Sequence, residues 1–185
     1  MRTIAFLCLA LAGGLSAGAK PSAWDEPFPG VVLDARNIRG FVGEYRWLSN
    51  FDPCTVAYEG LVYRSSEAAY QAAKFSPGAR AEFTQLDPDS AKKLARSRAF
   101  DAAAWDARKD RVMREVAWAK FSQNPELGRR LAATGDRYLE ETNWWNDPYW
   151  GVYQGQGKNM LGHILMETRA RLLRAASVRD NPGAP

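Results

Sequence analysis

The stretch Ser65-Ser-Glu-Ala-Ala-Tyr-Gln-Ala-Ala-Lys-Phe75 determines how the rest of the chain must pack. A serine at its start is a typical helix cap, and the residues that follow predict a helix over 67–75. Glu67, Gln71 and Lys74 are spaced i, i+4 and i+7, so they share one face of this helix. Alanines line the other faces, which allows neighbouring elements to approach closely.

The polar face of this helix has two interpretations. It can be a solvated surface, which is the commoner case for charged residues on a helix. It can also line a pocket, in which Glu67 would transfer protons and Lys74 would bind an anion or form an imine. The spacing alone favours neither interpretation.

The segments around this helix predict a helix-rich α+β fold. Before it, 55–58 and 61–63 are rich in β-branched and aromatic residues and flank a glycine turn, which predicts a hairpin. After it, periodic apolar residues predict helices over 91–98, 102–122 and 125–134, the second being the longest. Asn159 is expected to cap a last helix. We therefore expect one helix-rich α+β domain with a small antiparallel sheet near its start.

The segment Gly43-Glu-Tyr-Arg-Trp-Leu-Ser-Asn-Phe51 precedes the hairpin. Ser49 and Asn50 are residue types that close turns, and they could have that role alone. Arg46 and Trp47 next to them suggest a site for an anion and a flat ring. This pattern is a weak indication of function when taken alone.

A tryptophan-rich segment surrounds a single carboxylate at residues 140–151. Asp147 precedes a proline, which favours an extended backbone rather than a helix. Trp145, Tyr149 and Trp150 lie around it. Aromatic planes beside a carboxylate suit a flat heterocycle stacked next to a reacting centre. The alternative is a tryptophan-rich loop that only fills the core.

The segment Gly155-Gln-Gly-Lys-Asn leads into the last predicted helix. Gly157 would let the backbone approach a ligand, Lys158 supplies charge, and the helix start at Asn159 could bind phosphate through its amides. The longer glycine spacing and the Ser or Thr of a P-loop are missing. His163 is the single histidine and is interpreted as structural, so neither a metal nor a cofactor is expected.

Composition excludes several classes of protein. The 185 residues are 46% hydrophobic and 25% charged, which is ordinary for a globular domain. The formal charge of +4 is too small to indicate a nucleic-acid-binding protein by itself. No apolar run reaches the roughly 20 residues of a membrane-spanning helix. Two cysteines cannot form a disulfide framework.

The N-terminus resembles a secretory signal. Residues 1–19 combine an arginine, a short apolar stretch and a small-residue cleavage pattern. An N-terminal core helix is the alternative, which two consecutive glycines disfavour. We expect residues 20–37 to be an extended lead-in, 38–175 the domain and 176–185 a frayed tail. The mature protein would be exported to the periplasm or beyond, and it would be cytoplasmic if residues 1–19 are not a signal.

The segments taken in order resemble the NADAR family, also called YbiA-like proteins. The matching motifs include the four segments above, together with Lys120-Phe121 and Asn124-Pro-Glu-Leu127, and they span residues 41–173. The resemblance implies an N-glycosidase. Its substrate would be a phosphorylated ribosylaminopyrimidine of riboflavin synthesis, or ADP-ribosylated guanine, free or within a nucleic acid. A membrane partner is not implied.

The resemblance and the residue chemistry together select two sets of site residues. The candidate catalytic residues are Glu67, Lys74 and Asp147. The candidate substrate-binding residues are Arg46, Trp47, Ser49, Asn50, Gln71, Trp145, Trp150, Gly157, Lys158 and Asn159.

Cleavage of a ribosylamine can follow two routes, and the sequence leaves both open. An oxocarbenium route needs a carboxylate and a water, which Glu67 or Asp147 could position. An imine route needs an amine of lowered pKa, for which Lys74 is the candidate. A binding module that holds ADP-ribose or NAD without turnover is the competing function, although binding alone does not require both an acid and an amine. A purely structural domain with a tryptophan-filled centre is the third alternative.

Overall fold

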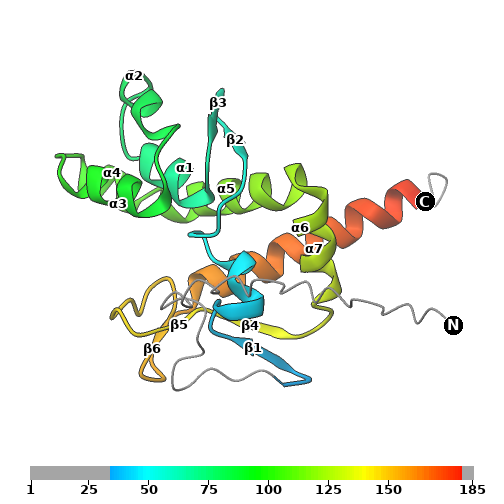
Figure 1. Cartoon of the computed structure of the whole chain (residues 1–185). Coiled ribbons are helices and arrows are strands. Elements are labelled where there is room, and N and C mark those ends of the chain that lie inside the picture. The colour runs from blue at the N-terminus through cyan, green and yellow to red at the C-terminus, as the bar shows by residue number, and fades with distance from the viewer. Residues whose placement is uncertain (1–33, 181–185) are drawn as a thin grey trace, which may run out of the picture.

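The computed structural model describes residues 34–180, and helices are the main elements of this region (Figure 1). The helices are α1 (Ser66–Ala72), α2 (Pro77–Arg80), α3 (Pro88–Arg96), α4 (Ala102–Asp106), α5 (Lys109–Gln123), α6 (Pro125–Ala133) and α7 (Met160–Asp180), with 3-10 turns η1 (Gly43–Leu48) and η2 (Ala81–Phe83). The strands are β1 (Asn37–Arg39), β2 (Val56–Tyr58), β3 (Leu61–Tyr63), β4 (Tyr138–Glu140), β5 (Thr142–Asn143) and β6 (Val152–Tyr153). The predicted helix-rich α+β fold is confirmed.

Helices α5 and α7 pack against each other in the middle of the domain (Figure 1). On one side of α5 lies α1, which in turn packs against α3, while α6 covers both α5 and α7. The β1–β4 pair lies on the other side, against α7. The domain therefore has a helical layer built on α1 and α3, and a second layer of short strands and loops on the far side of the central helices.

The described strands form three pairs rather than one sheet. The predicted hairpin is confirmed, because β2 and β3 pair antiparallel with Val56 opposite Tyr63. Two further pairs, β1–β4 and β5–β6, are parallel and were not predicted. The β1–β4 pair joins Asn37 to Tyr138 across most of the domain, a contact that local sequence patterns cannot indicate.

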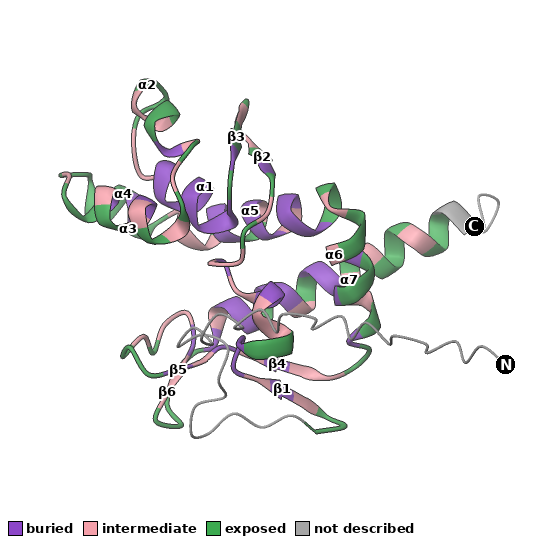
Figure 2. Ribbon diagram, in the orientation of Figure 1, coloured by how far each residue is buried: buried purple, intermediate pink, exposed green. Residues whose placement is uncertain are grey.

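Helix α1 forms where its sequence predicts it and is buried along its whole length (Figure 2). The Ser65 hydroxyl accepts a hydrogen bond from the Ala68 amide at 3.0 Å, which confirms the serine cap. The alanines are fully buried, so α3 can pack closely on α1. The helix ends at Ala72, before the predicted Phe75, because the amides of Lys74 and Phe75 bond to carbonyls three residues back and tighten the last turn.

The single helix predicted over 102–122 was wrong, because the chain breaks between α4 and α5. Arg108 leaves helical geometry, with φ −125° and ψ −7°. Its guanidinium donates to the Ala73 carbonyl at 2.6 Å and lies over the Trp105 ring. The break therefore allows α4 to place Trp105 against the end of α1.

The longest described helix is α7, with 21 residues, rather than the predicted central helix. Its inner side is buried at Leu161, Ile164 and Leu165. The C-terminal half of α7 extends past its packing partners and is mostly exposed (Figure 2). The helix continues to Asp180, beyond the domain boundary expected at residue 175.

The other predicted helices are confirmed in outline. Asp87 caps α3 by accepting from two backbone amides, and Pro125 opens α6. The proposed signal at 1–19 and most of the lead-in lie outside the described residues. Within 34–180, no helix combines the length and the hydropathy that a membrane crossing requires.

Candidate functional site

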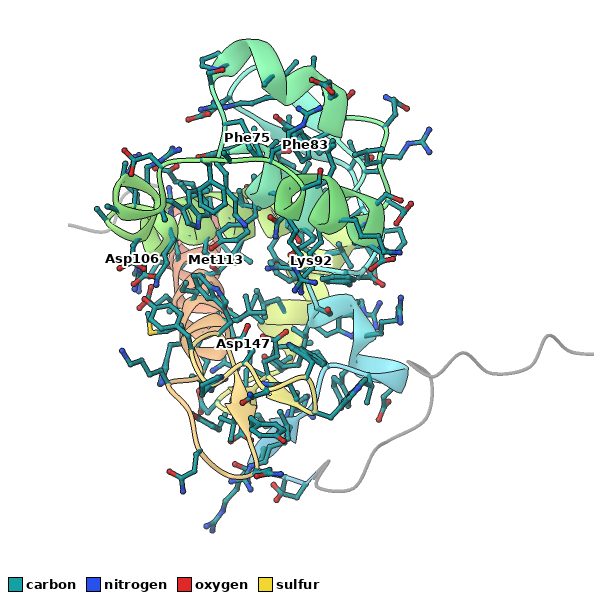
Figure 3. The ribbon with its side chains drawn as sticks, turned by 90° about the vertical axis from the view of Figure 1, so that its left-hand side faces the viewer. Phe75, Phe83, Lys92, Asp106, Met113 and Asp147 are labelled. Atoms are coloured by element: carbon teal, nitrogen blue, oxygen red, sulfur yellow. The ribbon has the colours of Figure 1, made fainter. Side chains whose placement is uncertain are left out.

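A pocket of about 620 Å³ lies between the α1–α3 layer and the loop that joins β4 to β6. In Figure 3, Lys92 reaches into it from the helices and Asp147 from the facing loop, with Met113 at one side. Both walls contribute polar side chains, and the loop wall also contributes tryptophans. The lining residues are Ser49, Asn50, Phe51, Glu67, Gln71, Lys74, Asp89, Lys92, Arg96, Met113, Glu141, Trp144, Trp145, Asn146, Asp147, Trp150 and Leu161.

Helix α1 supplies Glu67, Gln71 and Lys74 to this pocket, so its polar face lines a cavity rather than bulk solvent. The Gln71 amide donates to the Glu67 carboxylate at 2.7 Å, and both side chains are buried. The Gln71 Oε1 atom has no hydrogen-bond partner in the described structure. An unsatisfied buried acceptor beside a cavity is available to a ligand donor.

The Lys74 ammonium group lies among three aromatic rings. It is 5.9 Å from the Tyr70 ring centre, 5.2 Å from Phe100 and 5.6 Å from Trp105. Burial among these rings lowers the pKa of Lys74, against the opposing effect of the Glu67 carboxylate. The amine is therefore easier to deprotonate than an exposed lysine.

Helix α3 adds two cations, Lys92 and Arg96, which the sequence analysis did not select. They are spaced i, i+4 and so share one face of the helix. Two cations with this spacing are also common on solvent-exposed helix faces, so the sequence alone does not mark them as pocket residues. Burial raises the pKa of Glu67, while Lys92, the Gln71 hydrogen bond, Lys74 and Arg96 lower it. These cations give the α1–α3 wall a positive character.

The opposite wall presents Asp147 in a rigid turn. Its Oδ1 atom accepts from the amides of Tyr149 at 3.1 Å and Trp150 at 2.9 Å. The Asn143 side chain bonds both to the amide and to the carbonyl of Asp147. These contacts fix the direction in which the carboxylate faces the pocket.

Glu141 is a second carboxyl group on this wall, and the sequence analysis missed it. The residue is 9% exposed and follows β4 directly. Burial, and then the nearby Asp147 and Glu67 carboxylates, raise the pKa of Glu141 to about 8. A neutral carboxylic acid in this place can donate a hydrogen bond or a proton at neutral pH.

Tryptophans form the aromatic part of the lining. Trp150 packs edge-on against Tyr70, with ring centres 5.6 Å apart, so it belongs to the pocket floor near α1. Trp144 and Trp145 are 42% and 40% exposed and contact each other edge-on. The predicted tryptophan-rich loop is therefore partly core filling and partly an open aromatic rim.

Ser49 and Asn50 both line the pocket, as predicted, and both also have structural contacts. Lys120, 1% exposed, donates to the Ser49 carbonyl at 2.7 Å. The Asn50 carboxamide oxygen accepts from the Ser66 hydroxyl at 3.0 Å, which joins this turn to the start of α1.

Arg46 and Trp47 lie outside the pocket lining. Trp47 is buried against Phe121, and the Arg130 guanidinium covers its ring at 4.5 Å. Trp47 therefore fills the core, and neither residue of this pair reaches the pocket that holds Glu67 and Asp147.

The predicted phosphate site at the start of α7 is also absent from the lining, which does not include Gly157, Lys158 or Asn159. The amides of residues 158–161 already bond to the carbonyls of Pro148, Gly151, Tyr149 and Trp150. None of these four backbone amides is therefore free to bind a phosphate. A Cβ atom on Gly157 would lie 2.2 Å from the Gly151 carbonyl, so this glycine allows close packing of the chain on itself.

Asn159 positions the pocket wall instead of capping α7. Its side chain donates to the Leu139 carbonyl at 2.8 Å and to the Tyr138 hydroxyl at 2.9 Å. Its Oδ1 atom accepts from the Glu141 amide at 3.0 Å. Because all these groups are used, Asn159 fixes the backbone from which Glu141 projects.

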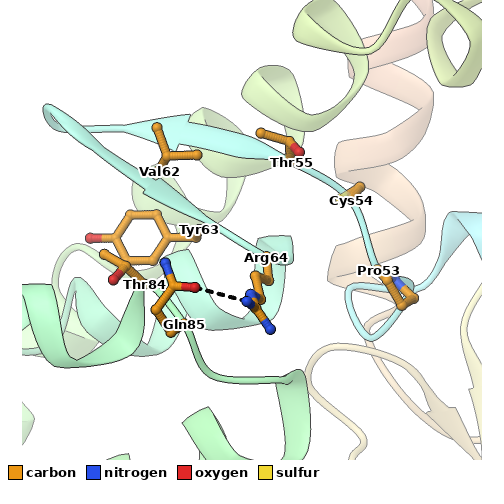
Figure 4. Close-up of a pocket in the computed structure, with 8 residues that line it drawn as sticks. All are labelled: Pro53, Cys54, Thr55, Val62, Tyr63, Arg64, Thr84 and Gln85. Carbon is orange, nitrogen blue, oxygen red and sulfur yellow. Dashed lines mark hydrogen bonds between the residues drawn. The ribbon is translucent and has the colours of Figure 1, made fainter.

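A second hollow, of about 450 Å³, lies beside the β2–β3 hairpin (Figure 4). It is open, and the Arg64 guanidinium that lines it is bonded to the Gln85 side chain at 2.8 Å. It lacks the paired carboxyl and amine groups of the first pocket. Among the described residues, no three His, Cys, Asp or Glu side chains gather as metal ligands would.

Comparison with known proteins gives consistent matches. A model of the NADAR domain matches residues 40–173. The N-glycosidase YbiA of Escherichia coli strain K12 is 37% identical over 134 residues, which is 70% of this chain and 82% of that protein. An N-glycosidase of Nostoc punctiforme is 31% identical over 135 residues, 69% of this chain and 86% of that protein.

A longer relative and a solved structure complete the comparison. A riboflavin biosynthesis protein of Vibrio vulnificus is 37% identical over 130 residues, 68% of this chain. This chain spans about a third of that protein, or 35% of its length. The NMR structure of Escherichia coli YbiA matches with a TM-score of 0.68 and 34% identity, covering 78% of this chain and 89% of that one.

Proposed function

Because the chain belongs to the NADAR domain family, we propose that it is an N-glycosidase that hydrolyses the bond between a ribose carbon and a heterocycle nitrogen. The observation that carries the proposal is the joint presence of Glu67, Lys74, Glu141 and Asp147 in one tryptophan-lined pocket. Cleavage of a ribosylamine uses an acid and a base, and in one of its two routes also an amine, and this cavity holds all three kinds of group.

The charge distribution suggests how such a substrate lies. Lys92 and Arg96 on α3 are suited to hold a phosphate, a role that the sequence analysis gave to Arg46, Lys158 and the α7 start. The heterocycle would lie against the tryptophans of the opposite wall. The scissile carbon then falls between the α1 groups and the loop carboxyls.

Two substrate classes fit this arrangement, and we propose a phosphorylated ribosylaminopyrimidine as the first. It needs one anion site, one flat-ring site and a reacting centre, all of which the lining residues supply. ADP-ribosylated guanine is the second. The exposure of Trp144 and Trp145 favours it, because an open rim leaves room for a larger base or an attached nucleic acid.

We propose that Lys74 acts through an imine. Its free amine adds to C1 of the open-chain iminium form of the substrate, and a new C–N bond forms. A proton moves from the Lys74 nitrogen to the heterocycle nitrogen, and the bond from C1 to the heterocycle breaks with its electron pair. Water then hydrolyses the Lys74 imine, which releases the sugar phosphate and restores the amine. The lowered pKa of Lys74 favours the first step.

A carboxylate-only route is the alternative chemistry. In it, Glu67 or Asp147 accepts a proton from the attacking water while C1 passes through an oxocarbenium ion. Lys74 would then contribute charge alone. Arginine in its place keeps the charge but cannot form an imine.

The test is mass spectrometry of the purified protein incubated with each substrate class. Lys74→Arg should be inactive, and borohydride added during turnover should attach the sugar mass to Lys74 of the wild type. Lys93→Arg is the matched control, because Lys93 is exposed and outside the pocket lining. An active Lys74→Arg variant without an adduct supports the carboxylate route. Tight binding of ADP-ribose without release of product would support the non-catalytic binding module.

We also propose that the enzyme is exported. A cleaved signal at residues 1–19 would export the enzyme, which would separate it from free riboflavin intermediates of the cytosol.

A further inference from the structure

Glu141 occupies a rigid position between β4 and β5. Its amide donates to the Asn159 side chain at 3.0 Å, and its carbonyl accepts from the Val152 amide at 2.9 Å. A Cβ atom on Gly151 would lie 2.1 Å from this carbonyl, so glycine is needed for the two segments to meet. The side chain therefore projects into the pocket from a fixed backbone.

The Glu141 carboxyl group differs from the other two carboxyl groups of the pocket. Glu67 is bonded to the Gln71 amide, and Asp147 is bonded to two backbone amides. Among the described residues, no partner forms a hydrogen bond or ion pair with the Glu141 side chain. A buried carboxyl group without donors is stabilised in its protonated form.

The charges around Glu141 lead to the same conclusion. Asp147 on its own wall and Glu67 on α1 disfavour a negative charge, and Lys92 on α3 opposes them only in part. Lys74, Asp89 and Arg96 also line the pocket, and the cations among them favour ionisation of Glu67. Three carboxylates in one cavity repel one another. Glu67 and Asp147 each accept hydrogen bonds that favour their charged forms, so Glu141 is the group best suited to keep its proton.

We propose that Glu141 is the general acid that protonates the leaving heterocycle, an inference that rests on the proposed N-glycosidase function and deepens it. The proton passes from the Glu141 carboxyl to the heterocycle nitrogen as the C1–N bond breaks and its electron pair goes to that nitrogen. In the carboxylate route, Glu67 or Asp147 takes a proton from the water that attacks C1, and transfer of that proton to Glu141 restores the acid. In the imine route, Glu141 delivers the leaving-group proton, and the proton released by Lys74 restores it.

The role can be tested with a graded set of leaving groups. The substrates are ribosylamine 5-phosphates made from anilines of decreasing basicity, so the sugar is the same in all of them. The less basic the aniline, the less its departure depends on protonation. Glu141→Gln should lose on the order of 10²- to 10⁴-fold in rate with the most basic aniline. The loss should shrink to less than about tenfold with the least basic one, because that amine departs without an acid.

Controls separate this role from a structural one and from failure of the proposed function. Glu141→Asp keeps an acid and should retain more activity than Glu141→Gln on the basic anilines. An equal loss on every aniline would overturn the acid role and leave the N-glycosidase proposal intact. Absence of cleavage by the wild type across the whole series would overturn both.

A second measurement does not depend on turnover. A carbon-13 NMR titration of the Glu141 carboxyl carbon, assigned by its loss in Glu141→Gln, should show a protonated acid at neutral pH. Titration below pH 5, as for an exposed glutamate, would refute the acid role whatever the kinetics show.

Discussion

Replacement of Asn159 by alanine distinguishes a residue that contacts substrate from one that positions the pocket wall. The side chain is 2% exposed and makes the three hydrogen bonds to Tyr138, Leu139 and Glu141. Asn159→Ala leaves the Leu139 carbonyl and the Glu141 amide buried without this partner, at about 1.5 kcal/mol each. Asn159 also has φ +49°, where alanine costs about 1 kcal/mol more.

These contributions add to about 4 kcal/mol of lost stability. For a chain of this size, roughly 2–4 °C of melting temperature corresponds to each kcal/mol, so the expected decrease is roughly 8–16 °C. Thermal unfolding followed by circular dichroism measures it. Asn146→Ala is the matched control, since Asn146 has φ +57° and is exposed, and it should change the melting temperature by only about 2–4 °C.

The opposite pattern would refute this reasoning. If Asn159→Ala melts like the control but fails to bind substrate, Asn159 contacts the ligand, as the sequence-based interpretation held. The hydrogen bonds to residues 138–141 would then contribute little to folding.

Further predictions concern the pocket and the N-terminus. Glu67→Gln should keep the melting temperature and lose on the order of 10²- to 10⁴-fold in turnover, because glutamine cannot accept a proton; near-normal turnover would reject a role in proton transfer. Wild-type stability should fall as the pH rises from about 4.5 to about 8, because the folded state binds the Glu141 proton more tightly than the unfolded chain, with an upper limit of about 5 kcal/mol. Denaturant unfolding at several pH values should show this fall, and Glu141→Gln should reduce it, leaving the part due to Glu67, whose pKa burial also raises; a pH profile unchanged by Glu141→Gln would contradict the prediction. N-terminal sequencing of protein from its native host should begin at Lys20, and an intact Met1 would show that no signal is removed.

Local patterns predicted the parts of the fold that depend on neighbouring residues. Ser65 caps α1 because a serine hydroxyl reaches an amide three residues on, and the hairpin follows from β-branched residues around a glycine. The break at Arg108 could not be predicted in this way. It depends on a contact with Ala73, 35 residues earlier in the chain.

The sequence predicted the site residues that share one face of a helix and have reactive side chains. It missed the residue whose role depends on its burial in the fold. Glu67, Gln71 and Lys74 share a face, so their meeting in one pocket follows from the period of the helix. Glu141 follows another glutamate and carries no motif, and only the folded chain shows that one of the two is buried. The glycine-rich segment was interpreted as a phosphate site because the first amides of a helix have no partner within that helix. In the fold, carbonyls of residues 148–151 accept hydrogen bonds from these amides.

The arrangement of the tryptophans gives the protein an optical signal of its own. Trp144 and Trp145 are accessible to water at the pocket rim, whereas the Trp150 ring packs against Tyr70 and Tyr149. A collisional quencher such as acrylamide should therefore reduce the fluorescence of Trp144 and Trp145 more strongly than that of Trp150. A heterocycle stacked on the rim would shield the pair and shift its emission to shorter wavelength. Ligand occupancy can thus be followed by fluorescence in variants that no longer turn over, without a label.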